Sequence, residues 1–215
     1  MTVRVELDAF GPAPLDDWSC YPGLRTEYSY LFCGDHLRAL DRIDFDVELA
    51  AVGAPPLADR RAVLAYGSNA CPAQLRRKYA EGDCSPFIPM VRAWASNLAV
   101  GYSDHESRYG AIPATVMASE GVHTEVFIAW LDAEQFDHLD RSEARNYERR
   151  SFDLAAHELY LADGPIPTAV DFYLSTHGVF SFGDVTPAVK GIDTTYRAGP
   201  LLTQREVRQF RRRSG

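Results

Sequence analysis

The sequence predicts an α+β fold in which a small mixed β-sheet, curled or barrel-like, is flanked by a few helices. Short apolar runs bounded by glycine and proline outnumber segments with helical periodicity, which favours a sheet-based core. Only three segments carry the residues that start a helix. The 215 residues are 46% hydrophobic and 24% charged, which is typical of a globular chain large enough to bury a core.

The first sixty residues differ from the rest of the chain in their many turn signals. These signals are the GPAP, PG and GAPP sequences at 11–14, 22–23 and 53–56. The run over 43–49 alternates apolar and acidic residues, which predicts a half-buried strand. We expect residues 1–60 to form an N-terminal extension packed on the main body, and residues 61–215 to form the main domain.

A strand, a tight turn and a helix follow one another at the start of the main domain. Residues 62–66 form a short apolar run typical of a buried strand, and residues 67–69 form the turn. Pro72 opens the helix, because proline fits the first helical turn. Further strands are predicted over 87–93, 97–102, 111–118, 123–131, 148–154, 157–161 and 168–174.

Two capping boxes mark the other helix starts. Asp132 is followed three residues later by Gln135, and Thr203 is followed at the same spacing by Glu206. The second box opens a basic helix at the C-terminal end. Its five arginines are interpreted as a solvated face that suits a helix C-terminus, with contact to an acidic partner as the alternative; the residues are Arg205, Arg208, Arg211, Arg212 and Arg213.

Charge and hydropathy exclude several classes of protein. The formal charge of −8 argues against a general nucleic-acid partner, which would require a basic face. No apolar run reaches 18 residues, so we expect no membrane segment, and the polar start predicts no signal peptide and a cytoplasmic location. Cys20, Cys33 and His36 suggest part of a zinc site, but no fourth ligand is evident, so no metal or cofactor is predicted.

The first candidate site is the turn formed by Tyr66, Gly67, Ser68 and Asn69. A glycine turn between a strand and a helix exposes helix N–H groups to an anionic group, and Ser68 and Asn69 add side-chain donors. The alternative is a structural turn in which Asn69 only caps the helix. Ser68 is not favoured as a nucleophile, because the residue two positions later is Ala70 and not glycine.

The second candidate is Glu143, in the helix that follows Asp132. At 100° per residue it lies only about 20° from Phe136 around the helix, so its carboxylate faces the core. A buried carboxylate needs a partner or a proton, and acid–base catalysis uses such a group. The alternatives are an ion pair with Arg145 or Arg149, or a helix that ends before Glu143.

The two candidate sites together resemble the gamma-glutamylcyclotransferase-like family. The resemblance covers about residues 62–175 and rests on motifs in the family's order. These are LAYGSN at 64–69, QL at 74–75, VRA at 91–93, VGY at 100–102, ATV at 114–116, LDRSE at 139–143 and YER at 147–149. It implies a small barrel-like α+β fold with a pocket between the motifs.

The resemblance also implies a function for both sites. Tyr66, Gly67, Ser68 and Asn69 would hold the gamma-glutamyl group of a small-molecule substrate, and Glu143 would be the catalytic acid and base. The α-amine would attack the side-chain carbonyl within the same molecule, releasing 5-oxoproline and a free amine without a metal or cofactor. 

Two other interpretations stay open beside this one. The chain could be a non-catalytic binding module of the same fold, or a tailoring enzyme acting on a gamma-glutamylated biosynthetic intermediate. The second is suggested because residues 1–60 and the segment after residue 175 depart from the family pattern. Residues 1–60 could also serve as an arm in a homodimer.

Overall fold

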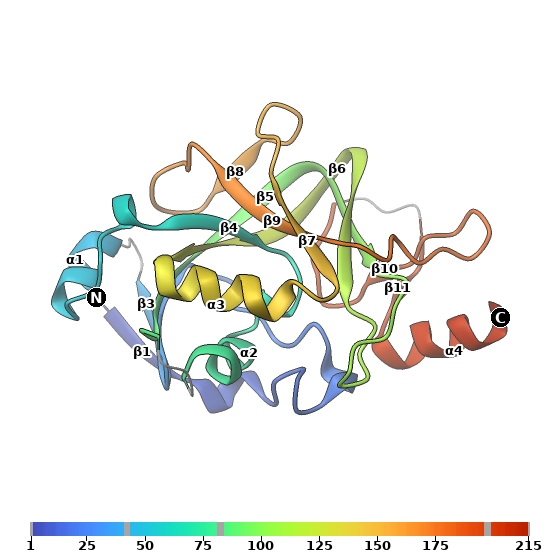
Figure 1. Ribbon diagram of the computed structural model, residues 1–215, viewed down its shortest axis with the longest axis horizontal. Coiled ribbons are helices and arrows are strands. Elements are labelled where there is room, and N and C mark those ends of the chain that lie inside the picture. The colour runs from blue at the N-terminus through green and yellow to red at the C-terminus, as the bar shows by residue number, and fades with distance from the viewer. Residues whose placement is uncertain (1, 41–43, 81–83, 196–198, 215) are drawn as a thin grey trace.

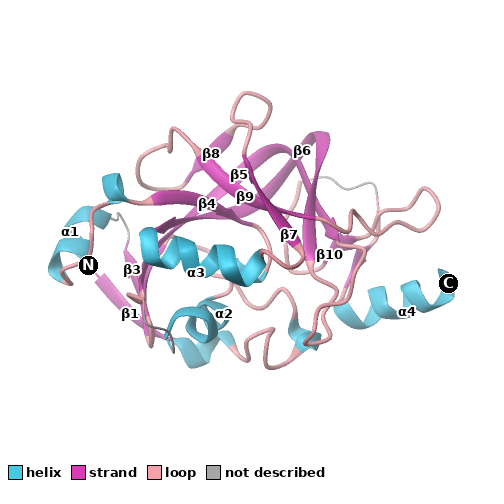
Figure 2. Ribbon diagram, in the orientation of Figure 1, coloured by secondary structure: helices cyan, strands magenta, loops and turns pink. Residues whose placement is uncertain are grey.

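The computed structural model describes residues 2–40, 44–80, 84–195 and 199–214. Within these residues it contains eleven strands in one mixed sheet and four α-helices (Figures 1 and 2). The strands are β1 Thr2–Glu6, β2 Tyr30–Cys33, β3 His36–Leu40, β4 Arg61–Ala65, β5 Phe87–Tyr102, β6 Ala114–Leu131, β7 Tyr147–Ser151, β8 Leu159–Leu161, β9 Val170–Ser175, β10 Ala188–Val189 and β11 Leu201–Leu202. The α-helices are α1 Phe45–Ala51, α2 Pro72–Leu75, α3 Ala133–Glu143 and α4 Gln204–Ser214.

The predicted α+β class and the mixed sheet are confirmed, although the sheet is larger than expected. Its main path runs β1-β3-β2-β5-β6-β4-β9-β7; β8 and β10 also pair with β5, and β11 pairs with β10. The first three strands come from residues 1–60, and β2 pairs antiparallel with β5. The sequence assigned to an extension therefore continues the same sheet.

The two central strands are longer than the sequence predicted. Four separate strands were expected where β5 and β6 run continuously over 87–102 and 114–131. The break expected near residue 96 is a β-bulge, at which Asn97 adopts a φ of 53° and the register shifts between Ser96 and Leu98. A bulge bends a strand without ending it, so the polar residues at this point mark a bend.

The strand predicted over 43–49 is wrong, because the described part of this run forms helix α1; residues 41–43 lie outside the described residues. Asp44 caps the helix by accepting a hydrogen bond from the Val47 N–H at 3.2 Å. Phe45 and Leu49 are buried, whereas Val47 is 62% exposed. Spacings of two and four residues coincide in this short run, so its alternation also fits a helix that buries positions i and i+4.

Strand β4 is covered on both faces of the sheet, which explains why its residues 62–65 are all apolar and buried. Neighbouring residues of β4 point to opposite sides, with Leu64 in one apolar cluster and Val63 in the other. Helices α2 and α3 pack on the side of Val63 through Leu75 and Phe136, and α1 packs on the opposite side through Phe45. Figure 1 shows α3 lying across the sheet with α2 below it. None of the helices in the described ranges is long and apolar enough to cross a membrane.

Candidate functional site

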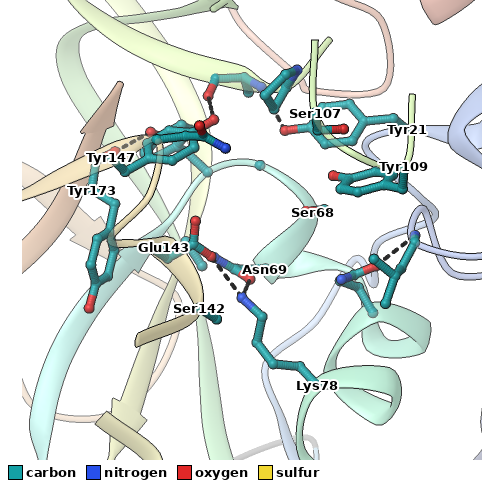
Figure 3. Close-up of a pocket in the computed structure, with 18 of the residues that line it drawn as sticks. Tyr21, Ser68, Asn69, Lys78, Ser107, Tyr109, Ser142, Glu143, Tyr147 and Tyr173 are labelled. Atoms are coloured by element: carbon teal, nitrogen blue, oxygen red, sulfur yellow. Dashed lines mark hydrogen bonds and ion pairs between the residues drawn. The ribbon is translucent and has the colours of Figure 1, made fainter. Parts of the chain in front are cut away.

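A cavity of about 500 Å³ lies between the turn after β4, the end of α3 and the loop between β5 and β6. All five residues predicted from the sequence line it, namely Tyr66, Gly67, Ser68, Asn69 and Glu143. Figure 3 shows the side chains of Glu143 and Asn69 together in this cavity. The fold therefore brings a turn and a helix end 74 residues apart in the chain into one site.

Two residues from the first thirty hold the turn at residues 66–69 in place. The Tyr21 hydroxyl accepts a hydrogen bond from the Ala114 N–H at 2.7 Å and lies directly against Gly67. A Cβ atom at residue 67 would lie 2.7 Å from that hydroxyl, so any larger residue would force the turn or the Tyr21 side chain to shift. The Arg25 guanidinium donates to the carbonyl oxygens of Tyr66 and Gly67. These contacts with Tyr21 and Arg25 fix the backbone of the turn.

Asn69 is not the helix cap that the alternative interpretation expected. Residues Ser68–Ala70 form a short 3₁₀ turn, and Cys71 precedes α2 without a side-chain cap. The Asn69 side chain instead points into the cavity, where its amide donates to Glu143 Oε1 at 3.1 Å. The first N–H groups of a helical turn have no acceptor within the turn, so the backbone at this point suits a negatively charged group.

Glu143 is the last residue of α3, and its partner is Lys78. The Lys78 ammonium donates to Glu143 Oε1 at 2.7 Å and to Asn69 Oδ1 at 2.9 Å, so the three side chains form a closed triangle. Arg149, one of the partners suggested by the sequence, pairs with Asp140 at 3.0 Å instead. The Glu143 side chain is only 17% exposed, so this ion pair is partly shielded from water.

The triangle leaves one carboxylate oxygen of Glu143 for a ligand. Both contacts of this carboxylate within the described residues use Oε1. Oε2 has no hydrogen-bond donor from the described chain, and Figure 3 shows the carboxylate directed into the cavity. A carboxylate held at one oxygen and open at the other can accept a proton from a bound molecule without losing its position.

Sequence reasoning missed Lys78 because nothing local distinguishes it. It follows two arginines, on the π-helical turn Arg76–Ala80 that continues α2. A basic run of this kind is commonly a solvated face, and only the tertiary fold shows which side chain turns inward. The Lys78 side chain is 12% exposed, compared with 54% for Arg76.

Five tyrosines form much of the remaining wall, namely Tyr21, Tyr66, Tyr109, Tyr147 and Tyr173. Burial raises the pKa of each of these phenols, in the case of Tyr109 to about 12, so all stay protonated at neutral pH. Tyr147 donates to the Ala114 carbonyl at 2.8 Å and Tyr173 donates to Asp140 at 2.9 Å. This tyrosine part of the wall is therefore uncharged and held by hydrogen bonds, which strengthens the field of the charged triangle within the cavity.

His105 also lines the cavity, and it is neutral at physiological pH. Its Nδ1 lies 2.6 Å from Ser103 Oγ, and its ring stacks on His177 with centroids 4.3 Å apart. Burial, together with the nearby His177 and Arg211, lowers the pKa of His105 from 6.5 to about 4. The imidazole therefore acts as an uncharged part of the wall.

This lowered pKa predicts a pH-dependent stability. Above pH 6.5 His105 is neutral in both the folded and the unfolded chain and does not change the free energy of unfolding. Between about pH 6.5 and 4 the unfolded chain binds a proton that the folded chain does not, which favours unfolding. The melting temperature should therefore fall as the pH is lowered from 6.5 to 4, and it should fall less in His105→Asn. Thermal melting of both proteins at several pH values measures this difference, and parallel curves would contradict the assignment.

Comparisons with known proteins add little to this geometry. No family model matches the sequence, and no curated protein matches it. One similar solved structure is the solution structure of At5g39720.1 from Arabidopsis thaliana, with 16% sequence identity and a TM-score of 0.40. The similarity covers 59% of this chain and 80% of that chain. 

Proposed function

We propose that the protein is a gamma-glutamyl cyclotransferase-type enzyme with a gamma-glutamylcyclotransferase-like fold. The observation that carries this proposal is the shared cavity, in which Glu143 lies beside the turn at residues 66–69 and no described residue donates to its Oε2. The motifs that resemble the family supply the two halves of this site. The substrate is a small molecule that bears a gamma-glutamyl group.

The reaction is an internal acyl transfer. The α-amine of the gamma-glutamyl group attacks its own side-chain carbonyl, so a new C–N bond closes the five-membered ring. The C–N bond to the outgoing amine then breaks, giving 5-oxoproline and the free amine. Glu143 takes a proton from the attacking nitrogen through Oε2 and returns it to the leaving nitrogen, so no proton is gained or lost overall.

Other residues of the cavity position the reacting groups. Lys78 and Asn69 fix Oε1 of Glu143, which sets the direction in which Oε2 faces. Backbone N–H groups at the start of the 3₁₀ turn can stabilise the oxyanion that forms at the attacked carbonyl. Because both reacting atoms belong to one molecule, folding it into the attacking geometry lowers the barrier substantially.

A panel of gamma-glutamyl compounds tests this proposal. The purified protein is incubated with gamma-glutamyl methylamide, gamma-glutamyl amino acids and a gamma-glutamyl compound with a bulky amine, and 5-oxoproline is measured. We expect 5-oxoproline from at least one compound. Stabilisation of the protein against heat by the compounds without any product would instead indicate a non-catalytic binding module. Turnover of only the bulky compound would favour a tailoring enzyme.

A further inference from the structure

The loop over 103–113, between β5 and β6, supplies a separate part of the cavity wall. His105, Ser107 and Tyr109 all line the cavity from this loop. In Figure 3 the side chains of Ser107 and Tyr109 lie across the cavity from Ser142 and Tyr173. The loop thus faces the triangle of Glu143, Lys78 and Asn69 from the opposite side.

Helix α4 binds this loop along one face. The Gln204 side chain, which is fully buried, accepts from the Ile112 N–H at 2.8 Å and donates to the Ile112 carbonyl at 2.8 Å. Residues 208 and 211 follow Gln204 at helical spacing, so their side chains lie on the same side of α4. Figure 1 shows the loop after β5 lying beside α4.

Two arginines of α4 complete the attachment. Arg208 donates to the Gly110 carbonyl at 2.9 Å and forms an ion pair with Glu106. Arg211 pairs with Asp104 at 3.0 Å and donates to its carbonyl at 3.2 Å. The interpretation of all five arginines as a solvated face is therefore wrong for these two. Arg212 and Arg213 are exposed, as that interpretation expected.

Trp18, from the N-terminal part of the chain, contacts both Arg208 of α4 and Gly110 of the loop. The Arg208 guanidinium lies 4.3 Å from the centre of the Trp18 ring, in a cation–π contact. Gly110 also packs on this ring, since a Cβ atom there would lie 3.4 Å from Trp18 Cδ1. Gly110 also has a φ of 93°, which favours glycine. Arg208 is therefore held between the indole ring and the loop backbone.

We propose that the 103–113 loop forms the subsite for the leaving amine, and that Arg208 of α4 is a positioning residue for it. This inference rests on the proposed function. The gamma-glutamyl group belongs beside Glu143 and the turn at 66–69, so the amine extends toward the opposite wall. The side chains there are an imidazole, a hydroxyl and a phenol, which select an amine whose bulk is uncharged and forms hydrogen bonds.

The test compares Arg208→Ala with Arg212→Ala, a matched change of an exposed arginine on the same helix. In Arg208→Ala we expect KM for a gamma-glutamyl compound with a bulky amine to rise about tenfold at nearly unchanged kcat. Turnover of gamma-glutamyl methylamide, whose amine is too small to reach the loop, should change little. Arg212→Ala should behave like the wild type with both compounds.

Amide hydrogen exchange tests, without any turnover, whether Arg208 holds the 103–113 loop in place. Amides of residues 103–113 should exchange faster in Arg208→Ala than in the wild type or Arg212→Ala, while those of α3 stay the same. If Arg208→Ala does not fold, Arg211→Ala removes only the outer contact and is expected to act in the same direction. Unchanged exchange in the loop, or equal effects on both compounds, would overturn this inference while leaving the proposed function intact. A wild type that turns over no gamma-glutamyl compound would instead overturn the proposed function.

Discussion

Replacing Glu143 by glutamine is expected to lower kcat for 5-oxoproline formation by about 10²–10⁴-fold, the usual contribution of a positioned general acid or base. Glutamine keeps the size of the side chain, and its amide oxygen can still accept from Lys78 and Asn69. It cannot take a proton from the attacking amine at neutral pH. Steady-state kinetics on a compound that the wild type converts would measure the loss, with KM changed far less than kcat.

Glu134→Gln provides the matched control for this substitution. It makes the same chemical change on the same helix, but Glu134 is exposed in the first turn and does not line the cavity. Its kcat should equal that of the wild type. A Glu143→Gln protein that melts near the wild-type temperature and retains full turnover would remove Glu143 from the mechanism.

The sequence was informative wherever the signal is local. The capping box of Asp132 and Gln135 is confirmed, with the two reciprocal hydrogen bonds at 2.9 and 3.0 Å. The core-facing direction of Glu143 followed from helical periodicity, and the structure places its side chain at 17% exposure. The turn at residues 66–69 was found because glycine and asparagine between a strand and a helix form a compact pattern.

Contacts between distant parts of the chain left no such signal. Lys78 is 65 residues from Glu143, and Arg25 is 41 residues from the Tyr66 carbonyl that it binds. Arg208 is 98 residues from Gly110. A single sequence shows the charge of these side chains but not their partners, because the tertiary fold decides which side chains meet. Similarly, alternation over 43–49 could not separate a strand from helix α1, since both bury residues four apart.

Gly67→Ala is expected to disable the site and destabilise the protein together. The added methyl would lie 2.7 Å from the Tyr21 hydroxyl, and Tyr21 cannot withdraw because it is buried and bound to the Ala114 N–H. Overpacking of this kind costs about 1–3 kcal/mol in folding free energy. Displacement of the turn by even about 1 Å should lower kcat/KM on the order of 10²-fold. Chemical denaturation and steady-state kinetics measure the two effects.

A double-mutant cycle with Tyr21→Phe separates the clash with the Tyr21 hydroxyl from the loss of backbone flexibility that any replacement of Gly67 causes. Removing the hydroxyl leaves the Ala114 methyl, at 3.5 Å, as the nearest atom to the added Cβ, which is ordinary van der Waals contact. Tyr21→Phe alone should be destabilising, because it leaves the Ala114 N–H without its acceptor. In the Gly67→Ala background the same change should restore part of the stability and activity, giving a favourable coupling between the two sites. Strictly additive losses would show that the Tyr21 hydroxyl does not determine the need for glycine at residue 67.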